Sequence, residues 1–141
     1  MGVDKNYHHS ELTDVIIGVF YDVYNELGFG FLESVYRKAM RVALIEKGLA
    51  VQEEVPVTVL FREKNVGDFK ADLLVNGSIL IELKTAERLG PEHEAQVLNY
   101  LRATSLELGL LLNFGPKPQV RRLLLDNTRK HYRAHTAGET T

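Results

Sequence analysis

Two acidic residues and one lysine occupy alternating positions on two neighbouring segments that have the pattern of strands. Asp72 lies in residues 69–75, Glu82 lies in residues 79–83, and Lys84 follows directly. Side chains alternate across a sheet and the odd positions of both segments are apolar, so the even positions are predicted to share the opposite face. Two carboxylates brought together in this way repel each other unless a cation lies between them. The pattern therefore predicts a divalent-metal site.

The connection between the two segments decides whether this shared face exists. A two-residue Asn76-Gly77 turn would place Asp72 opposite Ile81 and mix the apolar and polar faces. An odd-length loop, such as Val75-Asn76-Gly77 with Gly77 in the left-handed conformation of a bulge, keeps the two faces separate. We therefore expect an odd-length loop between the two strands.

Oxygen ligands of this kind suit a hard cation such as Mg²⁺, with Mn²⁺ as the alternative ion. The carboxylates of Asp72 and Glu82 and the backbone carbonyl of Leu83 would supply them. The competing interpretation is a solvated sheet face on which Glu82 and Lys84 form an incidental ion pair, because a short motif alone is weak evidence.

Polar residues on two predicted helices are further candidates for the same site. Gln96 and Tyr100 lie one turn apart in the helix predicted for residues 91–103, so they share a face. A buried Tyr100 with Gln96 at the surface is the alternative. Glu33 opens the second predicted helix, and its spacing from Arg37 is also typical of a surface ion pair.

The elements that must position these residues follow from the hydrophobic period, which is helical before residue 48 and alternating after residue 54. The predicted order is α-α-β-β-β-α-β-β, an α/β fold with a mixed central sheet flanked by helices. Ser10 is the expected N-cap of the first helix, and Leu32 and Val35 are expected to face the core. The predicted ranges are helices 10–27, 31–47 and 91–103 and strands 55–61, 69–75, 79–83, 108–113 and 120–125.

Length and composition describe one ordinary domain. The 141 residues are predicted to form a single unit, 1–141, with a core at about 10–126 and a frayed basic tail at 129–135. The chain has no cysteine, no secretory signal pattern and no apolar run near the roughly 20 residues of a membrane helix, so we expect a cytoplasmic protein and no membrane partner. A net charge of -2 means that any nucleic-acid binding must be local.

Several blocks of the sequence together resemble a known family. The segment from Gly30 through Glu33 to Tyr36 is similar to the signature of the GxxExxY proteins, which are placed in the PD-(D/E)XK nuclease superfamily. The resemblance runs from about Leu12 to Leu125. The other matching blocks are Phe69–Val75, Ile81–Lys84, Glu94–Leu101 and Leu108–Gly115.

The resemblance implies a restriction-endonuclease-like core and a role for each candidate residue. Asp72 and Glu82 would be metal ligands, and Lys84 would orient or activate the attacking water. Glu33 would be the acidic residue of the helix before the sheet and a third acidic ligand. The helix motif of exonuclease-like branches would be Gln96 and Tyr100.

The expected function is a metal-dependent phosphodiesterase, a nuclease that acts on nucleic acid, with DNA as the expected partner and Mg²⁺ or Mn²⁺ as the cofactor. The alternative is a non-catalytic nucleic-acid-binding or protein-interaction module that retains the nuclease fold. Self-association or a protein partner stays open, because the small domain has no separate recognition element. The candidate phosphate contacts are Arg37, Lys38, Arg41, Lys70, Arg88 and Arg102.

Overall fold

The computed structural model describes residues 5–134 of the chain, and their side chains from residue 9 onward. A five-stranded mixed sheet with the order β1-β2-β3-β4-β5 forms the centre, in which β3 and β4 are parallel and the other neighbours antiparallel. The predicted element order and fold class are confirmed. The elements are α1 (Lys5–Leu27), α2 (Glu33–Glu46), β1 (Val51–Phe61), β2 (Lys64–Val75), β3 (Ile79–Lys84), α3 (Pro91–Ala103), β4 (Leu108–Phe114), β5 (Pro118–Leu124) and the 3-10 turn η1 (Asn127–Arg129).

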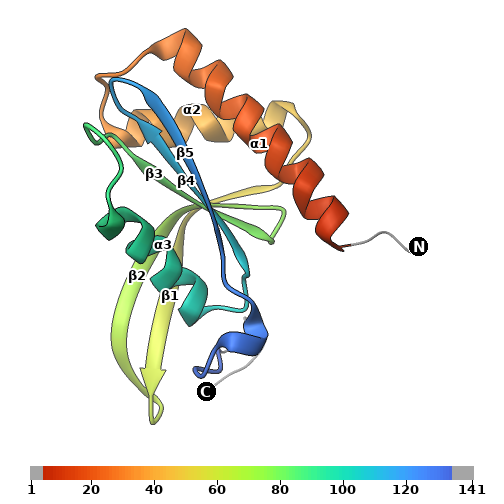
Figure 1. Cartoon of the computed structure of the whole chain (residues 1–141), viewed down its shortest axis with the longest axis vertical. Coiled ribbons are helices and arrows are strands. Elements are labelled where there is room, and N and C mark those ends of the chain that lie inside the picture. The colour runs from red at the N-terminus through yellow and green to blue at the C-terminus, as the bar shows by residue number, and fades with distance from the viewer. Residues whose placement is uncertain (1–4, 135–141) are drawn as a thin grey trace.

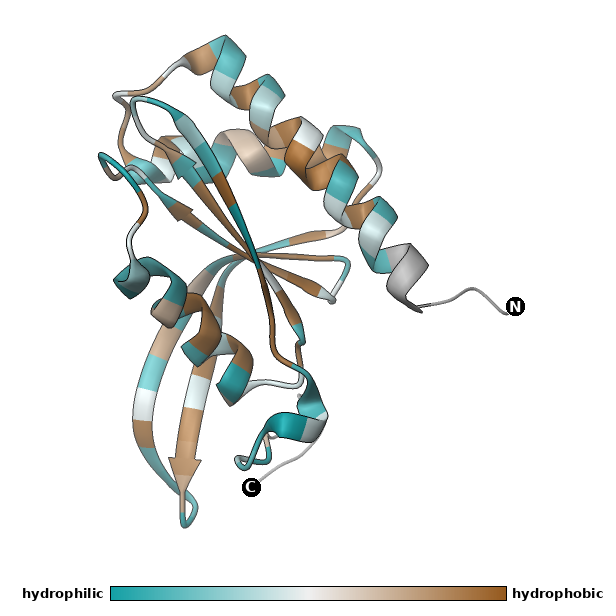
Figure 2. Ribbon diagram, in the orientation of Figure 1, coloured by the Kyte–Doolittle hydropathy of each residue, from teal (hydrophilic) through white to brown (hydrophobic). Residues whose placement is uncertain are grey.

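Helices cover both faces of this sheet. Helices α1 and α2 lie over one face and α3 lies beside the other, next to the lower part of β1 and β2 (Figure 1). The stripe Ile16, Val19, Phe20 and Val23 of α1 is buried against the first face, as its helical spacing predicts. Figure 2 shows alternating hydrophobic and hydrophilic turns along α1 and long hydrophobic stretches in the central strands.

The two central strands are buried on both faces. Every residue of β4 is buried, and so are the first five of the six residues of β3. Strands between two helical layers have apolar runs for this reason, so a polar residue inside one of them stands out. Glu82 in β3 and Asn113 in β4 are the buried polar residues of these two strands.

Some predicted boundaries are wrong. Ser10 lies inside α1, which already includes Lys5, so Ser10 does not cap the helix. Helix α2 begins at Glu33 with Leu32 as its N-cap residue, and both Leu32 and Val35 are exposed rather than inward-facing. Within residues 5–134, no helix is long and apolar enough to cross a membrane.

Two residues of the basic tail, Lys130 and Tyr132, make hydrogen bonds to the rest of the domain, in a segment that was expected to be frayed from residue 129. The Nζ of Lys130 donates hydrogen bonds of 2.8 Å to two backbone carbonyls after α3, and Lys130 is buried. The hydroxyl of Tyr132 accepts a 2.9 Å hydrogen bond from the backbone of Leu60. Residue 135, the last of the predicted tail, lies outside the described residues.

The loop between β2 and β3 has the predicted odd length, but it lies one residue later than the 75–77 example. Val75 pairs with Ile79, so residues 76–78 form the connection. Gly77 has φ 65°, the left-handed conformation that favours glycine. The apolar ends of both strands therefore face the α1 and α2 layer together.

The prediction that all odd positions of β2 share one face is wrong. Leu73 packs with α1 and α2, whereas Phe69 and Ala71 pack in the second core cluster with α3. Asp72 lies between them, and the register of β1 places it opposite Glu54, which has φ 49°. A left-handed residue increases the local twist of a strand, which explains the change of face next to Asp72. Figure 1 shows the β1–β2 hairpin curving past α3.

Candidate functional site

The Asp72 carboxylate lies beside β3 and is fixed there by a backbone hydrogen bond. Its Oδ2 accepts a 2.7 Å hydrogen bond from the N–H of Leu83. The paired register between β2 and β3 runs from Val75 to Leu73, so the Asp72 side chain continues the contact between the strands beyond the regular ladder. Asp72 is thereby held next to Glu82, the neighbour of Leu83 in β3.

The Glu82 side chain is buried with an unsatisfied oxygen. Glu82 is only 4% exposed, and its Oε1 is buried without a hydrogen-bond partner. Its Oε2 lies 3.6 Å from the Nζ of Lys84. A buried polar atom without a partner is costly and rare, and it commonly marks a missing ion or water. A cation bound here would satisfy the Oε1 atom.

The two carboxyl groups hold protons more tightly than they would in water. Burial, and then the charge of Asp72, raise the pKa of Glu82 to about 8, while the charge of Lys84 opposes the change. Burial also raises the pKa of Asp72, against the hydrogen bond from Leu83 and the charge of Lys84. A bound cation would favour both ionised forms.

The donor set fits a hard cation that is only partly enclosed by protein. Two carboxylates are present, but within the described residues no three His, Asp or Glu side chains lie close enough to form a complete cage. Mg²⁺ is commonly bound by one or two carboxylates and keeps water or substrate phosphate as its other ligands. The residues present are therefore compatible with Mg²⁺ or Mn²⁺.

Glu33 is brought towards this site by the start of α2. It is half-buried, and its pKa is raised first by burial and then by the charge of Asp72, with Lys84 acting in the opposite direction. These influences show that Glu33 shares the electrostatic environment of the site. It does not join Asp72 and Glu82 in a three-acid cluster.

Arg37 forms ion pairs with β1 instead of with Glu33. Its Nε lies 3.3 Å from Glu53 Oε1, and its Nη2 lies 3.2 Å from Glu54 Oε1. The same two glutamates also pair with Arg41 and Lys70. The alternative of a Glu33–Arg37 surface pair is therefore wrong, and three of the candidate phosphate contacts have acidic neighbours.

Gln96 and Tyr100 form a short hydrogen-bond chain on α3. The Nε2 of Gln96 donates to the Tyr100 hydroxyl at 2.9 Å, and that hydroxyl donates to the backbone carbonyl of Lys70 at 3.0 Å. Tyr100 is buried, and its pKa is raised by burial and by the charge of Glu82. The chain ties α3 to β2 two residues before Asp72.

Asn113 is a structural partner of the site that the sequence interpretation missed. It lies opposite Lys84 in the β3–β4 register and is fully buried. Its side-chain Oδ1 accepts from the N–H of Ala86 at 2.9 Å, and its Nδ2 donates to the carbonyl of Ala86 at 3.0 Å. The signal for it was a lone amide in an otherwise apolar strand sequence.

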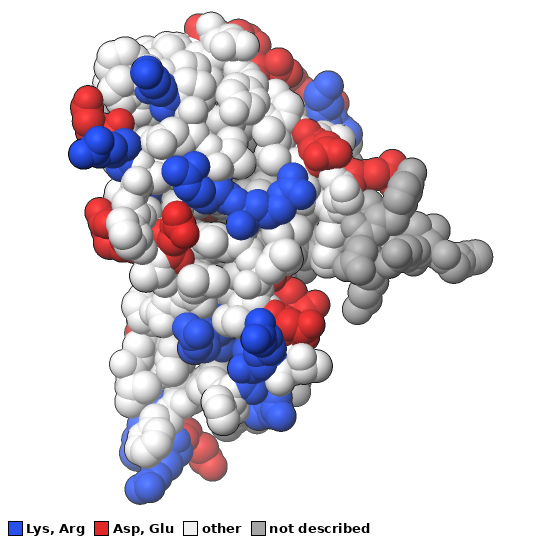
Figure 3. Space-filling model, viewed as in Figure 1, with Lys and Arg blue, Asp and Glu red and all other residues white. Residues whose placement is uncertain are grey.

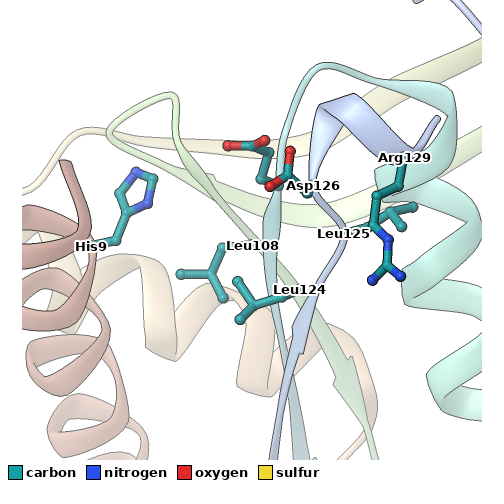
Figure 4. A pocket seen from close by; sticks show the side chains of 7 residues that line it. His9, Leu108, Leu124, Leu125, Asp126 and Arg129 are labelled. Carbon is teal, nitrogen blue, oxygen red and sulfur yellow. The ribbon is translucent and has the colours of Figure 1, made fainter.

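A cavity of about 340 Å³ opens at the other end of β4 from this site. It is lined by Leu108 and Leu124 together with His9, Asp126 and Arg129 (Figure 4). Leu108 pairs with Ile79 at the start of β3, five residues before Lys84. The cavity is therefore separate from the acidic cluster.

Comparison with known proteins identifies the family. The model of the PD-(D/E)XK nuclease superfamily matches residues 10–123, and a comparison with curated proteins found no match. A solved structure, described as the crystal structure of SSO0001, has a TM-score of 0.53 and 21% identity over 85% of this chain. This chain spans 60% of that protein, and the likeness supports the fold alone. Because the family model matches most of its length, the chain belongs to the PD-(D/E)XK nuclease superfamily.

Proposed function

We propose that the chain is a divalent-metal-dependent phosphodiesterase that cleaves nucleic acid, with DNA as the expected substrate. The observation that carries the proposal is the buried Glu82 Oε1 atom without a partner, beside Asp72 and with Lys84 on the same strand. Membership of a nuclease superfamily supports the same class of reaction. The narrower GxxExxY assignment remains a prediction.

Asp72, Glu82 and the Leu83 carbonyl would hold the Mg²⁺ or Mn²⁺ ion. Glu33 is proposed as a further acidic ligand, which would have to move closer to the other two acids than it lies here. When bound, such an ion supplies positive charge that polarises a phosphodiester and stabilises the charge that develops in the transition state. The hydrogen bond from Leu83 keeps the Asp72 carboxylate in place before the ion arrives. The ligands are therefore partly preorganised.

The ammonium group of Lys84 has two tasks in this proposal. It lies 3.6 Å from Glu82 Oε2 and is partly exposed, so its remaining donors can reach solvent and substrate. We propose that it orients the attacking water and stabilises the negative charge of the pentavalent transition state. The Gln96 amide is proposed to donate to a substrate phosphate or to the attacking water.

Tyr100 contributes by positioning. Its hydroxyl already accepts from Gln96 and donates to the Lys70 carbonyl. It therefore aligns Gln96 and fixes the backbone of β2 before Asp72. Because the Tyr100 hydroxyl holds the Gln96 amide, we expect that removing this hydroxyl displaces the amide and lowers the rate of turnover.

Positive charge for binding nucleic acid is local rather than general. Figure 3 shows Lys and Arg in several separate groups on one face, with acidic groups between them. Among the candidate phosphate contacts, Lys38, Arg88 and Arg102 have no carboxylate partner within the described residues. We propose these three as the first phosphate contacts to test.

The test is a cleavage assay on single- and double-stranded DNA and RNA with Mg²⁺, Mn²⁺ or chelator. Wild type should cleave at least one DNA substrate with metal, and chelator should stop the reaction. Lys84→Ala should abolish cleavage, whereas Lys47→Ala at the exposed C-terminal end of α2 should not. Metal binding without cleavage of any substrate would instead support the non-catalytic module.

A further inference from the structure

The loop between α1 and α2 exposes three large apolar side chains directly before Glu33. Phe29 is 59% exposed, Phe31 49% and Leu32 76%. Single exposed apolar residues are ordinary, but three within four positions form a patch of the kind that marks a binding surface. The patch lies at the entrance to α2, the helix that brings Glu33 to the acidic site.

The conformation of the loop backbone is fixed by two glycines and by hydrogen bonds to Tyr36. Gly28 and Gly30 have φ 70° and 118°, which glycine adopts without strain. The Tyr36 hydroxyl donates to the Gly28 carbonyl at 2.6 Å and accepts from the Phe31 N–H at 3.2 Å. Tyr36 itself is buried and stacks on Phe114, with 4.1 Å between ring centroids. The buried Tyr36 therefore holds the backbone of the loop that carries the exposed phenylalanine rings.

A cavity of about 330 Å³ lies between this loop, the segment after β3 and the β4–β5 turn. Its volume is at the lower end of the range of about 300–1,000 Å³ for small-molecule sites. Thr85 directly follows Lys84, and Phe31 lies two residues before Glu33, so two lining residues of the cavity are chain neighbours of acidic-site residues. Its side-chain lining includes Phe29, Phe31, Phe114, Pro116, Thr85 and Glu87.

The residue types that line this cavity favour one class of ligand over another. The phenylalanine rings offer flat apolar surfaces for stacking, and no Lys or Arg lines the cavity. Glu87 repels phosphate but can accept hydrogen bonds from the amino or imino groups of a nucleobase. A base therefore fits this cavity better than the sugar-phosphate backbone does.

We infer that this cavity, which we call the aromatic cavity, binds an unpaired nucleobase of the substrate next to the scissile phosphodiester. The inference rests on the proposed nuclease function and specifies its substrate class as single-stranded or frayed nucleic acid. Inside a duplex, pairing occupies the Watson–Crick edge of each base and stacking covers both of its faces, so only an unpaired base can stack on Phe31 and offer that edge to Glu87.

The test is binding of a single-stranded DNA oligonucleotide that carries one 2-aminopurine, compared with the same sequence in a blunt duplex. Chelator prevents cleavage during the titration. Wild type should bind the single strand more tightly than the duplex and quench the 2-aminopurine. Phe29→Ala and Phe31→Ala should each weaken single-strand binding roughly 5- to 150-fold, the equivalent of about 1–3 kcal/mol per stacked base, and reduce the quenching.

Phe61→Ala is the matched control, because Phe61 is 57% exposed but lies at the end of β1, in the hairpin with β2. It should bind like wild type. Phe31→Tyr keeps a stacking ring and should retain most of the affinity, and thermal melting should show that each variant is folded. Wild-type affinity and quenching in both Phe29→Ala and Phe31→Ala would overturn the aromatic cavity as a base site while leaving the nuclease proposal intact.

The two proposals fail in different ways. A wild-type protein that binds the oligonucleotide and cleaves it, but whose phenylalanine variants are unaffected, contradicts only the base site. A wild-type protein that neither binds nor cleaves any nucleic acid contradicts the proposed function and the base site with it. Equal affinity for single strand and duplex would overturn the inferred substrate class.

Discussion

The carboxylate of Asp72 accepts a 2.7 Å hydrogen bond from the backbone N–H of Leu83. Leu83 follows Glu82 in β3, so the two acidic side chains are tied to one short stretch of backbone. Because one oxygen of Asp72 is engaged in this bond, its other oxygen is the natural ligand for a cation. The proposed metal site would therefore depend on the contact between β2 and β3 rather than on either strand alone.

Asp72 and Lys84 should be separable by their effects on binding and on chemistry. Asp72→Asn keeps a hydrogen-bond acceptor for Leu83 but removes a charge, so Mg²⁺ or Mn²⁺ should bind more weakly. Lys84→Ala removes no ligand, so it should leave metal affinity largely intact and abolish turnover. Calorimetric titration and a cleavage assay on both variants measure this. An equal loss of metal affinity in both variants would show that Lys84 is structural.

The metal-free protein should lose stability as the pH rises towards 8. The pKa of Glu82 is about 8 in the folded state against an ordinary value of 4.5, so between these values the folded state binds more protons than the unfolded state. The free energy of unfolding therefore falls with pH across this window. Urea unfolding in chelator at about pH 5 and at pH 8 measures the difference.

Glu82→Gln is the control for this pH dependence, because it removes the titrating group and keeps the side-chain shape. In chelator the variant should have a flatter pH profile and should be more stable than wild type at pH 8. Mn²⁺ should stabilise wild type at pH 8 but not the variant. Identical pH profiles for the two proteins would mean that Glu82 ionises freely in the folded state.

Much of the fold follows from the sequence because the hydrophobic period changes clearly along it. The helix that carries Gln96 and the odd length of the loop between β2 and β3 were predicted from local patterns, whereas the exact pairing of Val75 with Ile79 was not. The alternation of apolar residues predicted the odd loop length, since a two-residue turn would have exposed an apolar row, and Gly77 permits the left-handed conformation that the loop requires. In these segments the local sequence pattern and the observed burial indicate the same structure.

The remainder depends on contacts between distant residues. The change of face between Ala71 and Leu73 arises where Glu54 adopts a left-handed conformation, and no single-strand pattern indicates that. Arg37 likewise pairs with Glu53 and Glu54 of β1 rather than with Glu33, which is nearer to it along the chain but does not form an ion pair with it. Spacing along one helix could not reveal this choice.

Gln96 should matter more for turnover than for metal affinity. Its amide is neutral and cannot replace a charged ligand, so Gln96→Ala should reduce cleavage and leave Mn²⁺ binding near wild type. Tyr100→Phe removes the acceptor of the Gln96 amide and the donor to Lys70, so it should show a smaller loss of turnover in the same direction. Loss of Mn²⁺ affinity in Gln96→Ala would place the amide among the ligands.

Asn113 should be important for stability and for the position of the segment after Lys84. Asn113→Ala leaves the N–H and carbonyl of the partly buried Ala86 without their side-chain partners. We expect a loss of about 2–3 kcal/mol in the free energy of unfolding. Asn99→Ala, at an exposed position of α3, is the matched control and should change it by less than about 0.5 kcal/mol. A similar small effect for Asn113→Ala would mean that water replaces the amide.

The last prediction concerns Glu33 and whether it is a ligand of the metal ion. Burial, and then the charge of Asp72, raise the pKa of Glu33, so in the metal-free protein its charge is unfavourable. Glu33→Gln should therefore leave the metal-free protein as stable as wild type or more stable, while it weakens Mn²⁺ binding. Thermal melting with chelator and with Mn²⁺ measures both effects, as the Tm and as its increase on adding metal. Glu46→Gln, at the exposed end of the same helix, should change neither. If Glu33→Gln shows the same metal-induced increase in Tm as wild type, Glu33 is not a ligand, and its task is limited to the electrostatics around Asp72.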